Sequence, residues 1–308
     1  MPDEKRPTLR IALALAALYV IWGTTYYVIR STVRDVPPLS MAALRFLAPG
    51  LVLLAVSVAR HGWPTIAHWR RGAVVGILML TIGNGAVTYG ETRMPSGLAA
   101  LLVTAVPMWA VGLDWAFTRK RPSASVLAGL ALGAAGVAVL VSRDTGGWTG
   151  GFDPRIALLI PVGSACWALG SLRSRRKDAP DFWTDLAVQM LAGGAALAVA
   201  GGALGEWPHL HWAGLRPALL GILYLSVFGS VVALGCFLWL LRVTTPAVAT
   251  TYAFVNPAVA VVLAMSLGDQ PFSAVVLGAT ALVIAGVALI VSGRRAPKAE
   301  VRALAEPE

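Results

Sequence analysis

Polar and aromatic side chains recur at helical spacing inside long apolar stretches of this sequence. Four polar residues follow one another at intervals of three, four and three positions, so an α-helix would place all of them on one face. They are Thr81, Asn84, Thr88 and Glu91. Similar spacing occurs in three further stretches, in Tyr19, Trp22 and Tyr26, in Ser164 and Trp167, and in Tyr252 and Asn256. Each stretch therefore carries one face that differs from its apolar surroundings.

These polar faces allow two interpretations. Ser, Thr and Asn often form hydrogen bonds between the helices of membrane bundles, whereas a shared polar face can also line an aqueous cavity. Four polar positions on one face exceed what packing requires, and deep indole rings offer a stacking surface and one donor to a neutral or aromatic solute. We therefore predict a cavity that binds a small molecule. Its expected substrate-binding residues are Tyr19, Trp22, Tyr26, Thr81, Asn84, Thr88, Trp109, Ser164, Trp167, Tyr252 and Asn256.

Ionisable side chains are rare inside these stretches, where each costs roughly 2.5–3.5 kcal/mol at a helix centre. Arg45 is expected to pair with Glu91 as an ion pair or gate, and the alternative is that Arg45 binds a substrate carboxylate. Asp114 is expected to pair with the basic residues 119–121. No acid or histidine occupies the expected midplane, which favours a neutral or zwitterionic solute over a cation and predicts facilitated exchange without proton coupling.

The sequence offers little support for an enzyme, a metal site or a cofactor. None of the motifs HExxH, GxSxG and GxxxxGKS/T occurs, and no apolar stretch pairs an acid with a histidine. Cys166 and Cys236 lie in apolar stretches and are expected to be small buried hydrophobes. His209 and His211 lie in a link and lack further ligands nearby. We therefore expect no enzymatic activity, no metal and no cofactor.

The composition identifies the class of protein that must position these residues. Of the 308 residues, 57% are hydrophobic and 13% are charged, against roughly 25% charged residues in soluble globular proteins. A membrane-spanning helix needs about 20 mostly apolar residues, and the alternation typical of barrel strands is absent from these segments. Ten segments qualify as membrane-spanning helices. Their expected bounds are 9–29, 39–59, 72–90, 96–118, 124–142, 155–173, 182–203, 217–240, 246–267 and 272–292.

The net charge of +10 follows a membrane topology rather than a nucleic-acid interface. With the N-terminus in the cytoplasm, 18 of the 25 Lys and Arg residues fall on inner links or adjoining span ends, 6 fall on outer ones, and Arg45 falls within a span. Positive residues concentrate on the cytoplasmic side of membrane proteins. We therefore predict a multi-pass membrane protein that contacts lipid, has both termini in the cytoplasm and binds no nucleic acid.

A repeat with an offset of 150 residues divides the chain into two similar halves. The segment AGVAVLVSR from Ala135 matches AGVALIVSG from Ala285, and Pro107 matches Pro257. Each half holds five spans, an odd number, so the second half must enter the membrane from the opposite side, as in transporters with inverted repeats. Both prolines interrupt their spans and are therefore the expected hinges.

The predicted architecture is an all-α integral membrane protein with ten transmembrane helices in two inverted five-helix repeats. A substrate site is expected between the repeats, near the midplane of the membrane. Rows of small residues in the fifth and tenth spans are expected to pack helices within the chain, which favours a monomer over a dimer. The repeats cover residues 1–143 and 144–296, and residues 297–308 form a cytoplasmic tail.

Short motifs add a family resemblance. They are Trp22-Gly23, Pro37 followed by Leu44-Arg45-Phe46, Pro95-Ser96-Gly97-Leu98 leading to Pro107, and Ala247 to Pro257 followed by Gly268-Asp269. Their order and spacing resemble the ten-helix EamA group of the drug/metabolite transporter superfamily over nearly the whole chain, and TYGETRMPSG is similar to the branch that exports aromatic and other neutral amino acids. The resemblance implies a secondary transporter of the bacterial inner membrane that exports small metabolites, foremost amino acids, by alternating access. The alternative is a broad drug or cation exporter on the same fold.

Overall fold

The structure, a computed structural model, describes residues 5–93, 99, 102–144, 154–175, 181–266 and 274–293 of the chain. Within these ranges the chain is helical and contains no β-strand, which confirms the predicted all-α class. In this part of the chain, five helices are long and apolar enough to cross a membrane, and two shorter apolar helices accompany them. The motifs at residues 95–98 and 268–269 and the predicted tail at 297–308 lie outside the described residues.

The first half of the chain forms helices close to the predicted bounds. They are α1 (Lys5–Thr32), α2 (Pro38–His61), α3 (Ile66–Gly76), the π-helix η1 (Ile77–Asn84), α4 (Gly85–Glu91), α6 (Ala105–Thr118) and α7 (Ala124–Asp144). The third span runs continuously through α3, η1 and α4 from Ile66 rather than from the predicted residue 72. Its start lies earlier because Thr65 and His68 form a capping box that satisfies the first backbone N–H groups.

The second half forms a matching series. Its elements are α8 (Pro154–Ser174), α9 (Phe182–Ala203), the 3-10 helix η2 (Trp207–His209), α10 (Trp212–Tyr224), the π-helix η3 (Leu225–Val232), α11 (Ala233–Val243), α12 (Pro246–Ala249), α13 (Tyr252–Ser266) and α14 (Ala274–Ser292). The eighth span is continuous through α10, η3 and α11. The predicted ninth span is interrupted at Thr250 and Thr251, whose hydroxyls donate to the carbonyls of Pro246 and Val248. Side chains thus satisfy backbone acceptors at the break.

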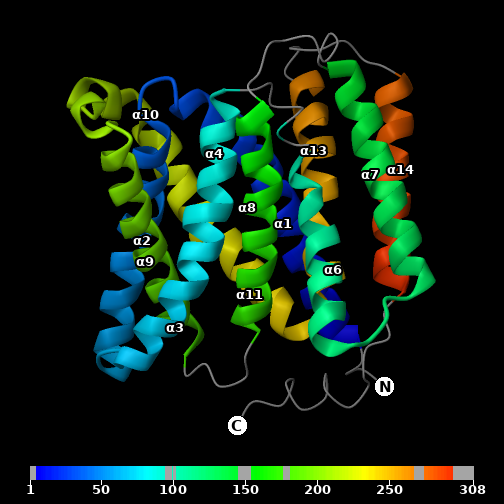
Figure 1. Cartoon of the computed structure of the whole chain (residues 1–308), viewed down its shortest axis with the longest axis horizontal. Helices are drawn as coiled ribbons and strands as arrows, with labels where there is room; N and C mark the ends of the chain where they lie inside the picture. Colours follow the sequence, from blue (N-terminus) through cyan, green and yellow to red (C-terminus); the bar gives the residue numbers. More distant parts are fainter. Residues whose placement is uncertain are drawn as a thin grey trace.

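Helices of the two halves pack in a reciprocal pattern (Figure 1). The second spans, α2 and α9, lie side by side, and so do the fifth spans, α7 and α14. The first span of each half packs against the third and fourth spans of the other half: α1 contacts α11 and α13, and α8 contacts η1 and α6. This exchange of equivalent contacts is the arrangement expected of two inverted repeats.

Glycines permit close helix approach at two of these contacts. A Cβ on Gly129 of α7 would lie 2.6 Å from the carbonyl oxygen of Gly286 on α14. A Cβ on Gly23 of α1 would lie 2.6 Å from Cγ1 of Val259 on α13. Small residues let helix backbones approach closely in membrane bundles. The small-residue row of α7 therefore packs helices within the chain, as predicted.

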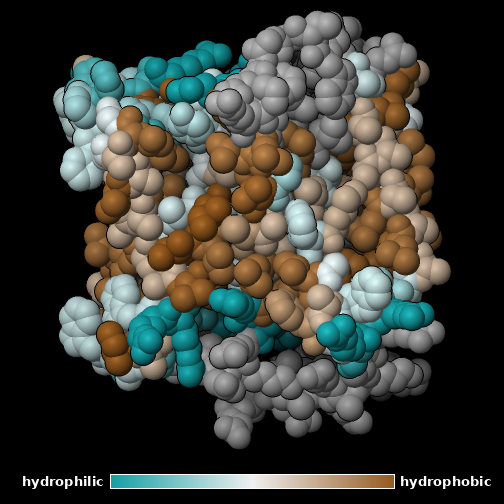
Figure 2. All heavy atoms as spheres, viewed as in Figure 1, coloured by the Kyte–Doolittle hydropathy of each residue, from teal (hydrophilic) through white to brown (hydrophobic). Residues whose placement is uncertain are grey.

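The visible surface carries a broad apolar band with hydrophilic residues beyond it at both ends (Figure 2). Helix α1 begins and helix α14 ends at the same end of the bundle, the lower end in Figure 1. There, Gly293 after α14 lies beside Ser123 and Ser125 at the start of α7. We refer to this end as the lower end and to the opposite one as the upper end. The lower end is the one that the charge distribution predicts to be cytoplasmic.

Candidate functional site

A cavity lies between the two halves of the bundle. Its walls come mainly from α1, α2 and η1 of the first half and from α8, η3, α11 and α13 of the second. The cavity volume is about 80 Å³, enough for several ordered water molecules. Seven of the predicted binding residues line it, namely Trp22, Tyr26, Asn84, Ser164, Trp167, Tyr252 and Asn256. The fold therefore brings together side chains that lie in spans one, three, six and nine of the sequence.

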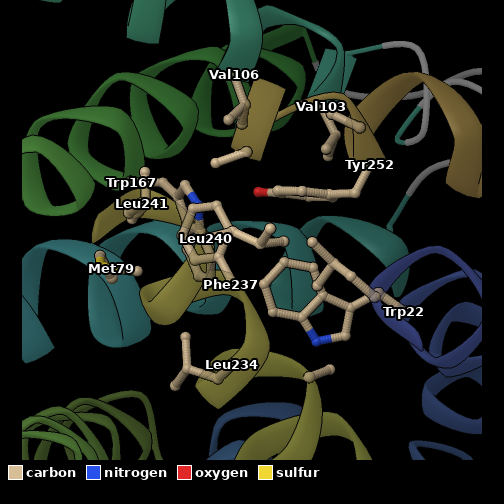
Figure 3. Packing of buried hydrophobic residues seen from close by; sticks show 14 of the residues in the cluster. Trp22, Met79, Val103, Val106, Trp167, Leu234, Phe237, Leu240, Leu241 and Tyr252 are labelled. Carbon is tan, nitrogen blue, oxygen red and sulfur yellow. The ribbon is translucent and has the colours of Figure 1, made fainter. Parts of the chain in front are cut away.

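Four aromatic rings form a cluster beside this cavity (Figure 3). The aromatic cluster consists of Trp22, Trp167, Phe237 and Tyr252, from α1, α8, α11 and α13. Trp22 and Trp167, the counterparts in the first span of each half, meet edge to face with ring centroids 5.7 Å apart. The ring centroids of Trp22 and Tyr252 are 4.6 Å apart. The indole N–H of Trp22 donates to the carbonyl of Gly229 at 2.9 Å, which fixes the orientation of this ring.

Polar atoms without a hydrogen-bond partner among the described residues face the same cavity. The hydroxyl of Ser164 and the side-chain oxygen of Asn256 are buried and form no hydrogen bond with a described residue. The indole N–H of Trp167 points toward the hydroxyl of Tyr252, but no hydrogen bond of normal geometry joins it to a described residue. A buried polar group left unsatisfied costs about 1–3 kcal/mol. The cavity thus presents hydrogen-bonding groups that a bound solute can satisfy.

Two π-helices occupy equivalent places in the repeats and form part of the cavity wall. η1 lies in the third span and η3 in the eighth. The wider turn of a π-helix changes which residues share a face, and such turns occur frequently at functional sites. Glycines stand at the wall in both: a Cβ on Gly83 would lie 3.1 Å from the Trp167 side chain, and one on Gly229 would lie 2.9 Å from an Arg45 nitrogen.

Arg45 lies in the cavity wall, but it does not form the expected direct ion pair with Glu91. Its side chain is only 4% exposed, and its Nε–H donates to the hydroxyl of Ser230 on η3 at 2.9 Å. Both carboxylate oxygens of Glu91 are buried without a hydrogen-bond partner among the described residues. Arg45 and Arg30 interact with Glu91 electrostatically at longer range. The direct pair is absent because the Arg45 guanidinium is directed to η3, whereas Glu91 ends α4.

The remaining four predicted binding residues lie away from the cavity. Tyr19 and Thr81 form hydrogen bonds between helices, to the Thr251 hydroxyl at 2.6 Å and to the Gly193 carbonyl at 2.9 Å. Thr88 is fully buried and contacts Asn84, one turn earlier in the same span. Trp109 is 45% exposed on the surface of α6. Thr81 leaves the face of Asn84 because the π-helix between them turns more widely than the α-helix on which the prediction was based.

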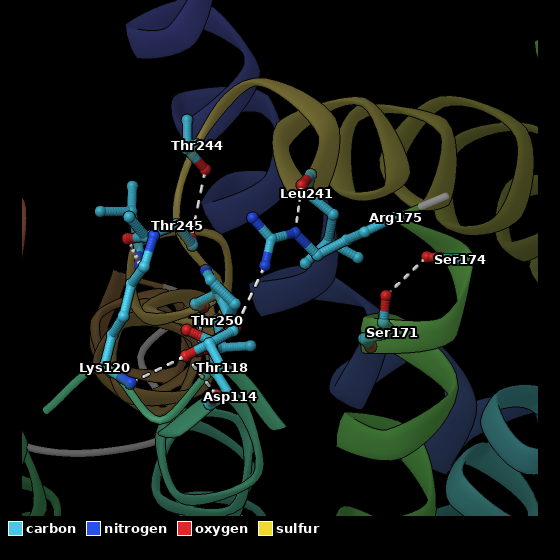
Figure 4. A network of polar contacts seen from close by, with 12 residues as sticks. Asp114, Thr118, Lys120, Ser171, Ser174, Arg175, Leu241, Thr244, Thr245 and Thr250 are labelled. Atoms are coloured by element: carbon cyan, nitrogen blue, oxygen red, sulfur yellow. Dashed lines mark hydrogen bonds and ion pairs between the residues drawn. The ribbon is translucent and has the colours of Figure 1, made fainter. Parts of the chain in front are cut away.

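A polar network joins the two halves at the lower end of the bundle (Figure 4). Arg175 at the end of α8 donates from Nη1 to the carboxylate of Asp114 on α6 at 3.2 Å, and from Nε to the carbonyl of Leu241 on α11 at 3.0 Å. Asp114 therefore pairs with Arg175 and not with the predicted residues 119–121. The sequence gives no signal for this pair, since the two residues belong to different repeats. We call these contacts, with the Tyr19–Thr251 hydrogen bond, the lower closure.

The proline pair expected to act as hinges occupies comparable positions. Pro107 lies in the first turn of α6, after the turn at Thr104, and Pro257 lies inside α13, after the break at residues 250–251. Pro257 removes one backbone hydrogen bond from α13, whereas Pro107 lies in a first turn, where the backbone N–H has no partner within the helix. Their role as hinges stays a prediction. Phe237, which completes the aromatic cluster, was missed by the sequence reasoning because a Phe in an apolar span is usually a packing residue.

Comparison with protein families adds independent information. The model of the EamA-like transporter family matches the chain twice, over residues 9–142 and 154–292. The inner membrane transporter YedA of Escherichia coli (strain K12) is 39% identical, with 94% of this chain and 93% of that protein covered. The transporter YvbV of Bacillus subtilis (strain 168) is 28% identical, with 96% of each covered. A protein of Salmonella typhimurium named as a probable amino-acid metabolite efflux pump is 28% identical over 51% of this chain and 50% of its own length.

A crystal structure with the same fold is also known. It superposes on this chain with a TM-score of 0.74 at 22% identity, and the match covers 96% of this chain and 99% of the other. This likeness shows that the helical arrangement occurs in an experimentally solved protein.

Proposed function

Since the chain belongs to the EamA-like transporter family of the drug/metabolite transporter superfamily, we propose that it exports small metabolites, foremost neutral and aromatic amino acids. The name of the YedA relative supports a location in the inner membrane. The name of the more distant efflux-pump relative supports amino-acid metabolites as the class of solute. The charge distribution supports an orientation with both termini in the cytoplasm.

The observation that carries this proposal is the cavity shared by both repeats. Its wall combines three rings of the aromatic cluster, those of Trp22, Trp167 and Tyr252, with polar atoms of Ser164 and Asn256 that have no partner among the described residues. Aromatic rings provide apolar contact area, and fixed polar groups orient a solute and provide specificity. A small solute with one apolar part and one hydrogen-bonding part fits these walls.

Alternating access supplies the transport mechanism. The two repeats would rock against each other around the cavity, so that it opens to one side of the membrane at a time. Opening toward the lower end requires the lower closure to break, because Arg175 joins α8 to α6 of the other repeat. It also requires the hydrogen bond between Tyr19 of α1 and Thr251, at the break before α13, to separate. The lower closure is thus the set of contacts that must re-form in each cycle.

The experiment is a counterflow assay with the purified protein in liposomes. Vesicles loaded with one unlabelled amino acid are diluted into the same labelled amino acid, and a panel of neutral, aromatic and charged amino acids is compared. We expect counterflow with neutral or aromatic members of the panel. Counterflow should fall by about tenfold or more in each of Trp22→Ala, Asn84→Ala and Trp167→Ala, because each substitution removes a side chain that lines the cavity.

Trp115→Ala is the matched control, because this tryptophan lies on the exposed surface of α6 at 47% exposure. It should transport like the unaltered protein. The folded yield of every variant, measured by size-exclusion chromatography, separates loss of transport from loss of folding. If all three cavity variants transport normally, the cavity is not the solute site.

A further inference from the structure

The described part of the cavity wall contains one formal charge, that of Arg45. Among the described residues that line the cavity, Arg45 is the only ionisable acid or base with a charge at neutral pH. It is buried, and removing an unpaired cation from water is costly. Ionisable residues inside membrane proteins therefore usually face a functional pathway.

Neighbouring residues hold the Arg45 guanidinium in place, but the described ones form hydrogen bonds with only some of its N–H groups. Of its five N–H donors, Nε–H bonds to a described residue, the hydroxyl of Ser230. Ser230 in turn donates to the carbonyl of Leu225 at 2.9 Å, which fixes the position of its oxygen. Gly229 leaves space for the guanidinium, because a Cβ there would lie 2.9 Å from an Arg45 nitrogen. The group is thus positioned, with further donors at the cavity.

Glu91 does not occupy the position that a carboxylate bound directly to Arg45 would take. Its carboxylate forms no hydrogen bond with a described residue, and its longer-range attraction is divided between Arg45 and Arg30. A guanidinium reaches its full stabilisation with a carboxylate only through direct, parallel hydrogen bonds. A carboxylate that enters the cavity can make those bonds, whereas Glu91 makes none.

Gly229 connects this cation to the aromatic cluster. Its carbonyl accepts the hydrogen bond of the Trp22 indole, and its Cα side faces Arg45. The Trp22 ring and the Arg45 guanidinium are therefore neighbours across one residue of η3. A solute whose carboxylate contacts Arg45 would have its apolar part beside Trp22. This spacing suits a compact molecule in which a carboxylate and an aromatic or apolar group are separated by few atoms.

We propose that Arg45 binds the carboxylate of the transported solute and excludes amines that lack one. The inference rests on the proposed function for its biological meaning, but it concerns binding and can be tested without transport. It assigns the cavity to carboxylic acids and zwitterions, with the acceptor oxygen of Asn256 as a candidate partner for an ammonium group. A cationic drug would meet the positive charge of Arg45 with no compensating acid in the described wall.

The test measures ligand-dependent thermal stabilisation of the purified protein in detergent. The probes are L-phenylalanine, 3-phenylpropionate and 2-phenylethylamine, which share a phenyl group and differ in carboxylate and ammonium. The first two should raise the unfolding midpoint in a concentration-dependent way, and the amine should not. Arg45→Gln should weaken the apparent affinity for both carboxylates by about tenfold to a hundredfold, the range for a hydrogen bond to a charged group.

Three further variants keep the result interpretable. Arg45→Lys retains the charge and should keep part of the affinity, although it loses the planar pair of donors. Ser230→Ala removes the group that positions Arg45 and should weaken carboxylate binding less than Arg45→Gln does. Arg216→Gln removes an exposed positive charge on α10 and should leave binding unchanged. If Arg45→Gln does not fold, Arg45→Lys and Ser230→Ala still test the proposal.

Specific results would overturn the proposal. Stabilisation by the amine that equals or exceeds that by the carboxylates contradicts it, and so does the absence of any stabilisation by the carboxylates. Unchanged carboxylate affinity in the folded Arg45 and Ser230 variants also contradicts it. Arg45-dependent carboxylate binding without counterflow would support this inference and refute the proposed transport of amino acids. Counterflow of neutral or aromatic amino acids that is unchanged in folded Arg45→Gln would do the reverse, since the protein would transport amino acids but Arg45 would not bind their carboxylate.

Discussion

Replacement of Glu206 tests how α2, the helix that carries Arg45, is held in place. The residue before α2, Pro37, provides no side-chain cap. Glu206, in the link between α9 and η2, supplies it instead: its carboxylate accepts hydrogen bonds from the backbone N–H groups of Leu39 at 3.1 Å and Ser40 at 2.7 Å, and from the Ser40 hydroxyl at 2.9 Å. A carboxylate at a helix N-terminus also interacts favourably with the helix dipole.

The expected cost follows from these three bonds. A hydrogen bond to a charged group contributes about 1.5–3 kcal/mol, and a buried donor left unsatisfied costs about 1–3 kcal/mol. Contributions within one network are not additive, so we expect about 3 kcal/mol of lost stability for Glu206→Ala. Glu206→Gln keeps one acceptor oxygen but loses the charge, and should cost about 1 kcal/mol. At roughly 2 °C per kcal/mol for a large domain, the unfolding midpoint should fall by roughly 6 °C and 2 °C.

The assay is thermal unfolding in detergent, followed by intrinsic tryptophan fluorescence. Asp35→Asn is the matched control, because Asp35 is an exposed acid in the link that leads to α2. Its midpoint should change by less than about 1 °C, as for most exposed surface substitutions. The reasoning is refuted if Glu206→Ala is no less stable than Asp35→Asn. Equal losses for the Ala and Gln variants would show that the charge of Glu206 contributes nothing.

Three further predictions concern topology, coupling and the lower closure. Alkaline phosphatase fused after Glu308 should be inactive and a fusion near Trp148 active, as the charge division implies; the reverse pattern would contradict the proposed orientation. Counterflow should proceed at equal pH on both sides of the membrane and should persist in Glu91→Gln. If a pH step instead drives solute accumulation, and Glu91→Gln abolishes that accumulation, Glu91 is the residue that couples transport to protons. Asp114→Asn should lower the unfolding free energy by less than about 1 kcal/mol, because the side chains of Arg175 and Asp114 are 33% and 32% exposed. The same substitution should alter the counterflow rate. A large loss of stability with unchanged transport would argue against a gating role for this ion pair.

Much of the architecture could be predicted because it depends on local composition. A stretch of about 20 apolar residues must be helical to satisfy its backbone in hydrocarbon, whatever its neighbours are. The ends of α7, α9 and α14 therefore lie within two residues of the predicted bounds. The repeat and the odd number of spans in each half likewise determine that the halves are inverted.

Part of the cavity could also be predicted, since helical periodicity shows which residues share a face. Trp22 and Tyr26 line the cavity together for this reason, and so do Ser164 and Trp167. Periodicity does not show which neighbouring helix a face meets. Tyr19 shares the face of Trp22, yet its hydroxyl is engaged by Thr251 in the lower closure.

Tertiary structure alone decided the remaining features, because each depends on contacts between residues far apart in the chain. The partner of Asp114 is Arg175 because the packing of α6 against α8 brings their lower ends together. The π-helices η1 and η3 carry no signature in the sequence, and their wider turns direct Thr81 away from the cavity and bring Gly229 beside both Trp22 and Arg45. The sequence by itself determined that this chain forms inverted helical repeats with polar faces in the membrane. Only the packing of those repeats decided which polar groups bind each other and which remain at the cavity for a solute.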